Sequence, residues 1–127
     1  MIFKENNKAI FLQIADRVAD DVLSGRLWAE NRIPSVRAYA SDIEVNANTV
    51  MRAYEYLTSQ GVIYNKRGIG YFISPGARDI IERRRREELE RGNLSDLFRQ
   101  LMMLGVSVKE LAGMYQNYIE QHNNTKE

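Results

Sequence analysis

The sequence predicts a mostly α-helical protein with one small β-hairpin, arranged as an N-terminal winged helix-turn-helix followed by a C-terminal helical segment. Three observations lead to this prediction. Two short helical patterns are separated by a tight break, two short β-type runs follow them directly, and the composition changes abruptly to charged helical sequence after Pro75-Gly76. Helix, turn, helix and hairpin in this order are typical of a winged helix-turn-helix.

The two helices of the motif are marked by their caps and by their apolar spacing. Ser35 can cap a first helix that we expect to end near Glu44, and Asn46 can cap a second helix that Gly61 stops. Each helix carries apolar residues at the i, i+3, i+4, i+7 spacing that buries one face. These residues are Val36, Tyr39, Ala40 and Ile43 in the first helix and Val50, Ala53, Tyr54 and Leu57 in the second.

The hairpin that follows supplies the wing. Residues 62–64 have the composition of a strand, residues 66–68 form a turn that ends in glycine, and Gly70 to Ile73 is the returning strand. Ahead of the motif, Ala9 to Ser24 forms an amphipathic helix that Gly25 ends. We expect this helix to complete a three-helix core.

A domain boundary is expected where the charged sequence begins, giving a winged domain over 1–76 and a helical tail over 77–127. Ala77 to Arg91 favours a charged helix in which acids and bases lie four residues apart, and Gly92-Asn93 bends or interrupts it. Glutamates surround the Arg83-Arg84-Arg85-Arg86 run, and four consecutive helical residues point around the whole helix. We therefore interpret this helix as a solvated linker.

Two amphipathic helices, Leu94 to Leu104 and Val108 to Glu120, end the chain, and residues 121–127 are expected to fray. These helices can cover only part of each other's apolar stripes. A second copy of the chain is the plainest partner, since a two-fold dimer buries the same patch on both subunits; the alternative is packing onto the winged domain of the same chain. The residues predicted to form the dimer are Leu94, Leu97, Phe98, Leu101, Leu104, Val108, Leu111, Tyr115, Tyr118 and Ile119.

An ordered set of short motifs resembles a known family. The motifs are Pro34-Ser35-x-Arg37, Val45-Asn46-x-Asn48-Thr49-Val50, Leu57-x-x-x-Gly61-x-Ile63 and Arg67-Gly68-x-Gly70-x-Phe72. Each motif alone is common, but the set in this order resembles the DNA-binding domain of GntR-type transcriptional regulators. The second motif and the short tail resemble the YtrA-like subfamily, in which a small helical tail dimerises. The resemblance implies a homodimeric, sequence-specific regulator, most simply a repressor that occludes a promoter.

The residues expected at an interface with double-stranded DNA are Ser35, Arg37, Asn46, Asn48, Thr49, Arg52, Lys66, Arg67, Gly68 and Gly70. Asn48 and Thr49 lie in the first turn of the second helix, away from its apolar face, and an amide side chain can bond adenine in bidentate fashion. Asn46 is expected to act mainly as the N-cap of this helix. Gly68 and Gly70 serve the backbone conformation first, although a missing side chain also permits close approach to DNA.

The cations of this set have simpler interpretations beside the DNA-binding one. Arg37 can contact phosphate or be a solvated arginine. Arg52 can contact a base or a phosphate, or it can pair with Glu55 on the same helix. Lys66 and Arg67 at the wing tip can contact the DNA backbone or the minor groove, or they can be merely exposed.

The composition argues against several other functions. The net charge is +1 at pH 7, so any basic surface must come from the placement of the cations, and the chain contains no cysteine for a disulfide or a thiol nucleophile. His122 is the only histidine, and the sequence has neither a paired His and carboxylate at useful spacing nor a Walker-type phosphate loop. We therefore expect no enzyme activity, no cofactor and no metal.

The N-terminus, MIFKENNKAIF, lacks the apolar run of a signal peptide, and no segment of the sequence is long and apolar enough to span a bilayer. These observations predict a cytoplasmic protein without a membrane partner. A second class of function is a non-catalytic protein-interaction module that uses a winged helix as a docking surface, and such a module would show no salt-sensitive affinity for DNA. The sequence identifies neither the operator nor a small-molecule effector.

Overall fold

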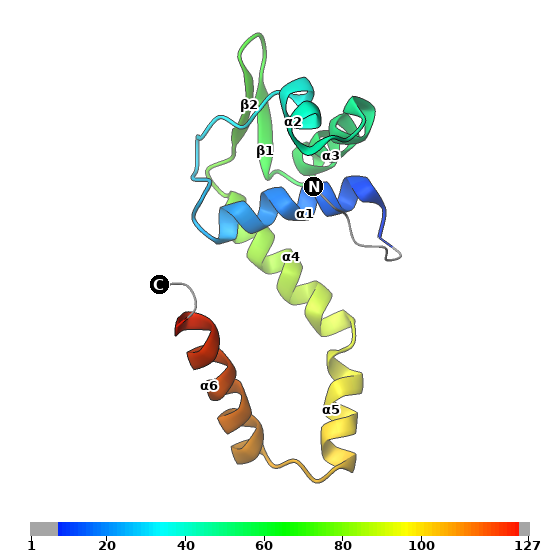
Figure 1. Ribbon diagram of the computed structural model, residues 1–127, viewed down its shortest axis with the longest axis vertical. Helices are drawn as coiled ribbons and strands as arrows, with labels where there is room; N and C mark the ends of the chain where they lie inside the picture. Colours follow the sequence, from blue (N-terminus) through cyan, green and yellow to red (C-terminus); the bar gives the residue numbers. More distant parts are fainter. Residues whose placement is uncertain (1–7, 125–127) are drawn as a thin grey trace. The chain divides into compact units, whose positions relative to one another are not determined.

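The helices and strands follow one another in the order expected of a winged helix-turn-helix with a helical tail (Figure 1). The computed structural model describes residues 8–124. Its elements are α1 (Ile10–Leu23), α2 (Val36–Ile43), α3 (Ala47–Ser59), β1 (Ile63–Lys66), β2 (Gly70–Ile73), α4 (Ala77–Arg91), α5 (Leu94–Met103) and α6 (Val108–Asn124). The chain divides into two compact units, the winged unit up to Arg85 and the tail unit from Arg86. The predicted fold class is confirmed.

Three helices form the core of the winged unit. α3 contacts α1, α2 and β1, so the second helix of the motif lies at its centre. Both predicted caps are present: the Ser35 hydroxyl accepts from the Ala38 N–H at 3.1 Å, and the Asn46 side-chain oxygen accepts from the Asn48 N–H at 2.7 Å. The buried side chains of these elements and of β2 are Ile14, Ala15, Val18, Ala19, Val22, Ala40, Ile43, Val50, Ala53, Tyr54, Leu57, Ile63 and Ile73.

Tyr54 joins three parts of the winged unit. Its side chain is fully buried, and its hydroxyl donates a hydrogen bond to the backbone carbonyl of Pro34 at 2.7 Å. Its ring lies 5.0 Å from that of Tyr71 on β2 and 6.2 Å from that of Tyr39 on α2, measured between ring centres. Burial raises the pKa of the Tyr54 phenol well above its ordinary value, so the hydroxyl stays neutral. α3 is thereby fixed against the start of α2 and against the wing.

The wing is an antiparallel two-stranded hairpin whose second strand also pairs with the segment before α2. β1 and β2 pair in register up to Lys66 opposite Gly70, so β1 extends two residues beyond the predicted strand. Residues 31–33 pair with the other edge of β2, where the N–H of Ile33 donates to the carbonyl of Tyr71 at 3.0 Å. The sequence analysis did not predict this pairing, which ties the start of α2 directly to the wing.

The first part of α4 belongs to the winged unit. Ala77 and Ile81 are buried in its core. A guanidinium nitrogen of Arg84 donates to the Tyr56 hydroxyl on α3 at 2.8 Å, and Arg85 forms an ion pair of 2.6 Å with a carboxylate of α1. This part of α4 is therefore held on the surface formed by α1 and α3.

These contacts correct the interpretation of the arginine run as a solvated linker. Arg84 and Arg85 are anchors because successive residues of a helix point in different directions, and these two face α3 and α1. The first compact unit ends at Arg85 and the second begins at Arg86. The boundary predicted from the sequence lies earlier, after residue 76.

α6 is longer than expected. It runs to Asn124, into the segment that was expected to fray. His122 stacks on Tyr118, one turn earlier, with ring centres 3.8 Å apart, and this contact stabilises the last turns. Residues 125–127 of the expected frayed end lie outside the described residues, as do residues 1–7, on which the expectation about a signal peptide partly rests.

Replacing Tyr54 by phenylalanine removes the hydroxyl and keeps the ring. We expect the free energy of unfolding to fall by about 0.5–1.5 kcal/mol, the usual net contribution of one hydrogen bond. Denaturant unfolding followed by circular dichroism measures the change. Tyr71→Phe is the control, because the Tyr71 hydroxyl makes no hydrogen bond within residues 8–124 although its ring belongs to the same cluster. Equal losses in both variants would contradict the importance of the Tyr54 hydroxyl.

The same variant predicts a difference at alkaline pH. Because the folded-state pKa of Tyr54 is raised above the ordinary value of 10.0, its neutral form stabilises the fold below about pH 10, and this stability is lost as the pH rises further. Unfolding measured from pH 8 upward, to about pH 11.5, which lies above the unfolded-state tyrosine pKa, should show a smaller loss for Tyr54→Phe than for the parent protein. Parallel curves would show that Tyr54 does not contribute.

Gly70 has a φ angle of +145°, a backbone conformation that residues with a side chain rarely adopt. A Cβ at this position would also lie 3.0 Å from Nε of Arg32. We expect Gly70→Ala to lower the free energy of unfolding by about 1–3 kcal/mol, the cost of a strained backbone. Gly76→Ala is the matched control, since an added Cβ there meets nothing within 4 Å. If both variants melt alike, the strain at Gly70 is refuted.

Candidate nucleic-acid interface

The start of α3 presents polar side chains to solvent. Because Asn46 caps the helix, Asn48 and Thr49 fall in its first turn. Asn48 is exposed and Thr49 is half-buried, whereas Val50 and Tyr54 point into the core. The Asn46 side-chain oxygen is occupied by the cap, as expected. The Asn48 amide lies where it can form hydrogen bonds with a ligand.

The start of α2 lies beside the base of the wing, because the segment that leads into it pairs with β2. Ser35 and Arg37 are both exposed there. A cation in the first turn of a helix is disfavoured by the helix dipole. No carboxylate within residues 8–124 pairs with Arg37, so its charge is available to an anionic ligand.

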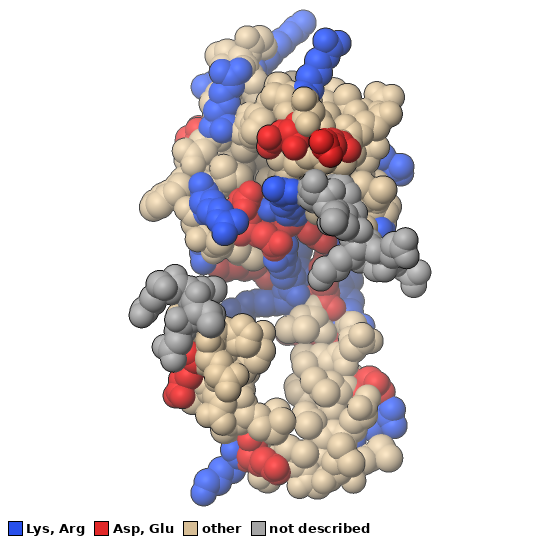
Figure 2. Space-filling view, in the orientation of Figure 1, with Lys and Arg blue, Asp and Glu red and all other residues tan. Residues whose placement is uncertain are grey.

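The wing carries cations near its tip. Nζ of Lys66 lies 5.2 Å from the ring centre of Phe72, Arg67 is exposed, and Gly68 has a φ of +79° in the turn. Figure 2 shows Lys and Arg side chains projecting from the end of the winged unit where the wing and α2 lie. The wing therefore offers cations to an anionic ligand.

Arg32 also belongs to this surface, and the sequence analysis missed it. It forms an isolated bridge with Phe72 of β2, and its guanidinium lies against the backbone of Gly70. Arg32 is exposed. No local signal marks it in the sequence, because only the pairing of its segment with β2 brings it to the wing.

Arg52 does not pair with Glu55, the simpler of its two interpretations. Within residues 8–124 it forms no ion pair, and its side chain lies against an aromatic ring. Its guanidinium carbon lies 4.2 Å from the centre of the Phe11 ring. Together with Asn48 and Thr49 it lines a hollow of about 370 Å³, whose other wall is the start of α1. The sequence analysis missed Phe11 as part of this site.

The exposed cations of α2, α3, the wing and the segment before α2 form what we call the cationic set: Arg32, Arg37, Arg52, Lys66 and Arg67. None of them takes part in an ion pair within residues 8–124. Six cations elsewhere do, namely Lys8, Arg26, Arg78, Arg85, Arg91 and Arg99. The cationic set can therefore bind phosphates without first breaking an internal ion pair.

The tail unit exposes its apolar stripes. None of the side chains described from Arg86 to Asn123 is buried. Of the predicted dimer residues, the half-buried ones are Leu94, Leu101, Leu111 and Ile119, and the exposed ones are Leu97, Phe98, Leu104, Val108, Tyr115 and Tyr118. Further exposed apolar residues that the sequence analysis left out are Leu89, Met102, Met103 and Met114. Exposed apolar residues that share one helix face, as the residues of the predicted stripes do, mark an interaction site.

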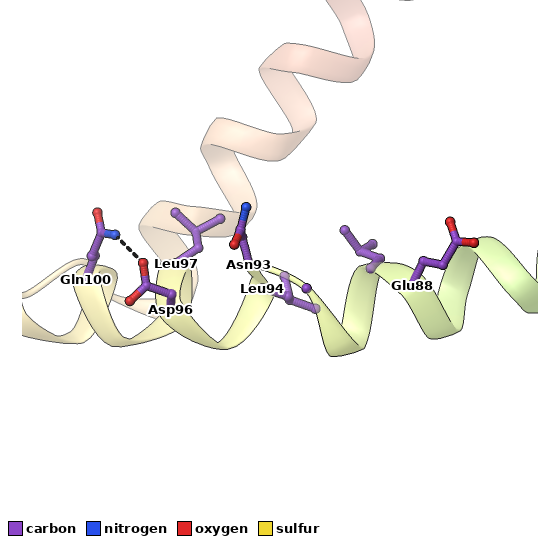
Figure 3. A pocket seen from close by; sticks show the side chains of 8 residues that line it. Glu88, Asn93, Leu94, Asp96, Leu97 and Gln100 are labelled. Atoms are coloured by element: carbon purple, nitrogen blue, oxygen red, sulfur yellow. Dashed lines mark hydrogen bonds between the residues drawn. The ribbon is translucent and has the colours of Figure 1, made fainter. Parts of the chain in front are cut away.

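A hollow of about 710 Å³ lies at the bend between α4 and α5. Figure 3 shows that the side chains of Glu88, Asn93 and Leu97 point to the same side of the bend, and that Gln100 donates to Asp96. That hydrogen bond is 2.9 Å long. The tail unit thus offers a groove with leucines and polar side chains in addition to its apolar stripes.

In the part of the chain that the structure describes, no cluster of His, Cys, Asp or Glu side chains could hold a metal ion. No helix among residues 8–124 is long and apolar enough to cross a membrane.

Known proteins resemble the chain in both sequence and structure. Residues 11–73 match the family described as bacterial regulatory proteins, gntR family. The uncharacterized HTH-type transcriptional regulator YhcF of Bacillus subtilis is 32% identical over 107 residues, which are 84% of this chain and 87% of the relative. The HTH-type transcriptional repressor YtrA of Bacillus subtilis is 36% identical over 72 residues, which are 57% of this chain and 55% of the relative.

Among solved structures, a putative transcriptional regulator of the GntR family from Bacteroides thetaiotaomicron is 54% identical to this chain. The match has a TM-score of 0.75 and covers 90% of this chain and 99% of the other. These similarities extend well beyond the residues of the motif, and they confirm the resemblance that the ordered motifs predict. The chain therefore belongs to the GntR family, with YtrA-type regulators among its relatives, and is a DNA-binding transcriptional regulator rather than an enzyme.

Proposed function

We propose that this chain acts in the cytoplasm as a homodimeric repressor, which binds a palindromic operator in double-stranded DNA and thereby occludes a promoter. The observation that carries the proposal is the cationic set, which is exposed and unpaired on the elements that enclose the start of α3. Neutralisation of phosphates by such cations supplies much of the affinity of a DNA-binding protein and makes it depend on salt. The name of the relative YtrA, a transcriptional repressor, supports repression.

The residues divide into two roles. The start of α2 and the wing contact the DNA backbone and set the orientation of the protein, through Ser35, Arg37, Lys66 and Arg67. Asn48 and Thr49, at the exposed start of α3, contact base edges in the major groove. Gly68 and Gly70 let the wing backbone approach the DNA closely. Asn46 contributes by holding the start of α3 in place.

The tail unit supplies the dimer interface in this proposal. No side chain described from Arg86 to Asn123 is buried, so its apolar stripes are at most half covered within the unit. A second copy covers the same stripes on both subunits through a two-fold axis. The same axis places two copies of α3 at half-sites about 34 Å apart, or a multiple of that distance, on a palindromic operator.

We also propose that the tail holds no enclosed effector pocket. A ligand pocket needs about 300–1,000 Å³ with most of the ligand surface covered. The hollow at the bend between α4 and α5 is large enough, but no residue around it is buried, so we assign it to the surface that the dimer covers. An effector would act at the dimer seam or near Pro75-Gly76, where it would change the spacing of the two α3 helices.

The first test is selection of operator sequences from random duplexes, followed by affinity measurements at several salt concentrations. We expect a palindromic site bound at about 10⁻⁸ to 10⁻¹¹ M, with affinity that falls steeply as salt rises. Arg67→Ala should weaken specific and random DNA by the same factor. Asn48→Ala should cost about 1–3 kcal/mol on the best site and relax the preference at one base pair.

Asn117→Ala is the control for Asn48→Ala, because it removes an exposed amide of α6 that is not among the predicted dimer residues. Equal losses on specific and random DNA for Asn48→Ala would exclude its role in base reading. Absence of any salt-sensitive affinity would exclude the repressor and favour a protein-interaction module.

A second test concerns assembly, and it uses the full chain because Ala77 and Ile81 belong to the core of the winged unit. Phe98→Glu places a charge on the exposed apolar stripe of α5, and we expect dimerisation to weaken at least tenfold, or about 1.4 kcal/mol. Met103→Glu makes the same kind of change about 140° away around the helix and should leave the dimer intact. Sedimentation equilibrium measures both. Unchanged dimers in both variants would move the interface off this stripe.

A further inference from the structure

We propose that Phe11, in the first turn of α1, is a positioning residue for Arg52 and thereby contributes to operator specificity. The inference rests on the proposed contact of α3 with DNA. It begins from one contact, in which the guanidinium carbon of Arg52 lies over the Phe11 ring, 4.2 Å from its centre. Phe11 lies outside the helix-turn-helix and the wing, so a contribution from it adds α1 to the elements that determine specificity.

The Phe11 ring is held by a second aromatic contact. It meets the Tyr56 ring edge to face, with centres 6.1 Å apart and planes at 77°. Tyr56 lies on α3, one turn beyond Arg52, and its hydroxyl accepts a hydrogen bond from Arg84 at 2.8 Å. Phe11 is half-buried in this contact between α1 and α3. The ring is therefore a fixed support for the Arg52 side chain.

Stacking on a ring leaves the hydrogen-bond donors of Arg52 available. The five N–H groups of a guanidinium point outward in its plane, whereas an aromatic ring attracts its face. An ion pair with Glu55 would occupy those donors instead. Arg52 can thus stay on Phe11 while it donates to a base edge, and O6 and N7 of guanine are the acceptors that a guanidinium matches best.

Among residues 8–124, no side chain fills the space in front of Arg52, which can admit a nucleotide. The hollow of about 370 Å³ has Asn48, Thr49 and Arg52 on the side of α3, and Ala9, Ile10 and Phe11 on the side of α1. The predicted base-reading residues and Arg52 therefore share one recess. A base edge that enters this recess can meet the Asn48 amide and the Arg52 guanidinium together.

Positioning has a consequence for specificity as well as for affinity. A long flexible side chain loses rotamer freedom when it binds. Phe11 imposes part of that loss before DNA arrives, and it favours the arrangement of Arg52 beside the recess over arrangements that reach a phosphate. Without the ring, Arg52 can still attract DNA, but it distinguishes bases less well.

Phe11→Leu tests the proposal, because it keeps apolar packing against Tyr56 and removes the ring face. We expect binding to the selected operator to weaken about two- to fivefold, as for loss of a partly exposed cation–π contact, with reduced discrimination at one base pair. Binding to random DNA should not change. Phe11→Trp retains a ring face and should restore both properties.

A double-mutant comparison with Arg52→Gln tests whether Phe11 acts through Arg52. If Phe11 acts through Arg52, Phe11→Leu has no further effect on operator binding once Arg52 is replaced. The same loss in both backgrounds would show that Phe11 acts only by packing and would overturn the inference. If Arg52→Gln leaves operator binding unchanged while Asn48→Ala weakens it, the inference fails and the proposed function stands. If neither variant weakens operator binding, the proposed base reading by α3 fails as well.

A measurement without DNA separates positioning from folding. The ring current of Phe11 should displace the Nε–Hε resonance of Arg52 from its random-coil position in an NMR spectrum. Phe11→Leu should return this resonance toward that position, whereas Ile10→Ala, which changes the neighbouring 47% exposed side chain, should not. Melting temperatures show whether each variant folds. An Arg52 resonance that is unmoved by Phe11→Leu in a folded protein would overturn the inference.

Discussion

The hydrogen bond from the Tyr54 hydroxyl to the Pro34 carbonyl is the constraint on which the DNA-binding surface depends. Tyr54 lies on α3, Pro34 leads into α2, and Tyr71 contacts the Tyr54 ring from β2. A buried hydroxyl that loses its partner costs more free energy than the hydrogen bond contributes. Arrangements in which α2, α3 and the wing shift apart are therefore disfavoured. The exposed residues at the ends of these elements are therefore held at fixed distances from one another.

The chain builds a positive surface from a net charge of +1 by pairing its cations unevenly. Arg85 and Arg78 are used for ion pairs on or beside α4, where they hold the helix to the winged unit or stabilise it. The cationic set is left without such partners. Net charge is thus a poor guide to function in this chain, because what matters is which cations are already neutralised.

Local sequence patterns were sufficient for the elements and insufficient for the contacts between them. The side-chain caps at Ser35 and Asn46 act within three residues, so the starts of α2 and α3 could be predicted. The positions of Arg32, Phe11 and Arg84 could not, because each depends on a neighbour far along the chain: Gly70, Arg52 and Tyr56. The predicted DNA-contact residues are mostly exposed at the ends of elements, which spacing does indicate, but no spacing rule shows which cations a ring or a carboxylate already holds.

The stability of the tail unit depends on association, whereas the winged unit has a buried core of its own. α5 has 10 residues, and helices shorter than about 12–15 residues are marginal in water unless an apolar face is buried. No described side chain of the tail unit is buried in the single chain. In the proposed dimer, the ordering of α5 and the association of two chains are therefore coupled equilibria. Only a linked pair of winged units gains the avidity of two half-sites. In this proposal the tail contacts no DNA, but operator affinity depends on protein concentration because the tail must dimerise.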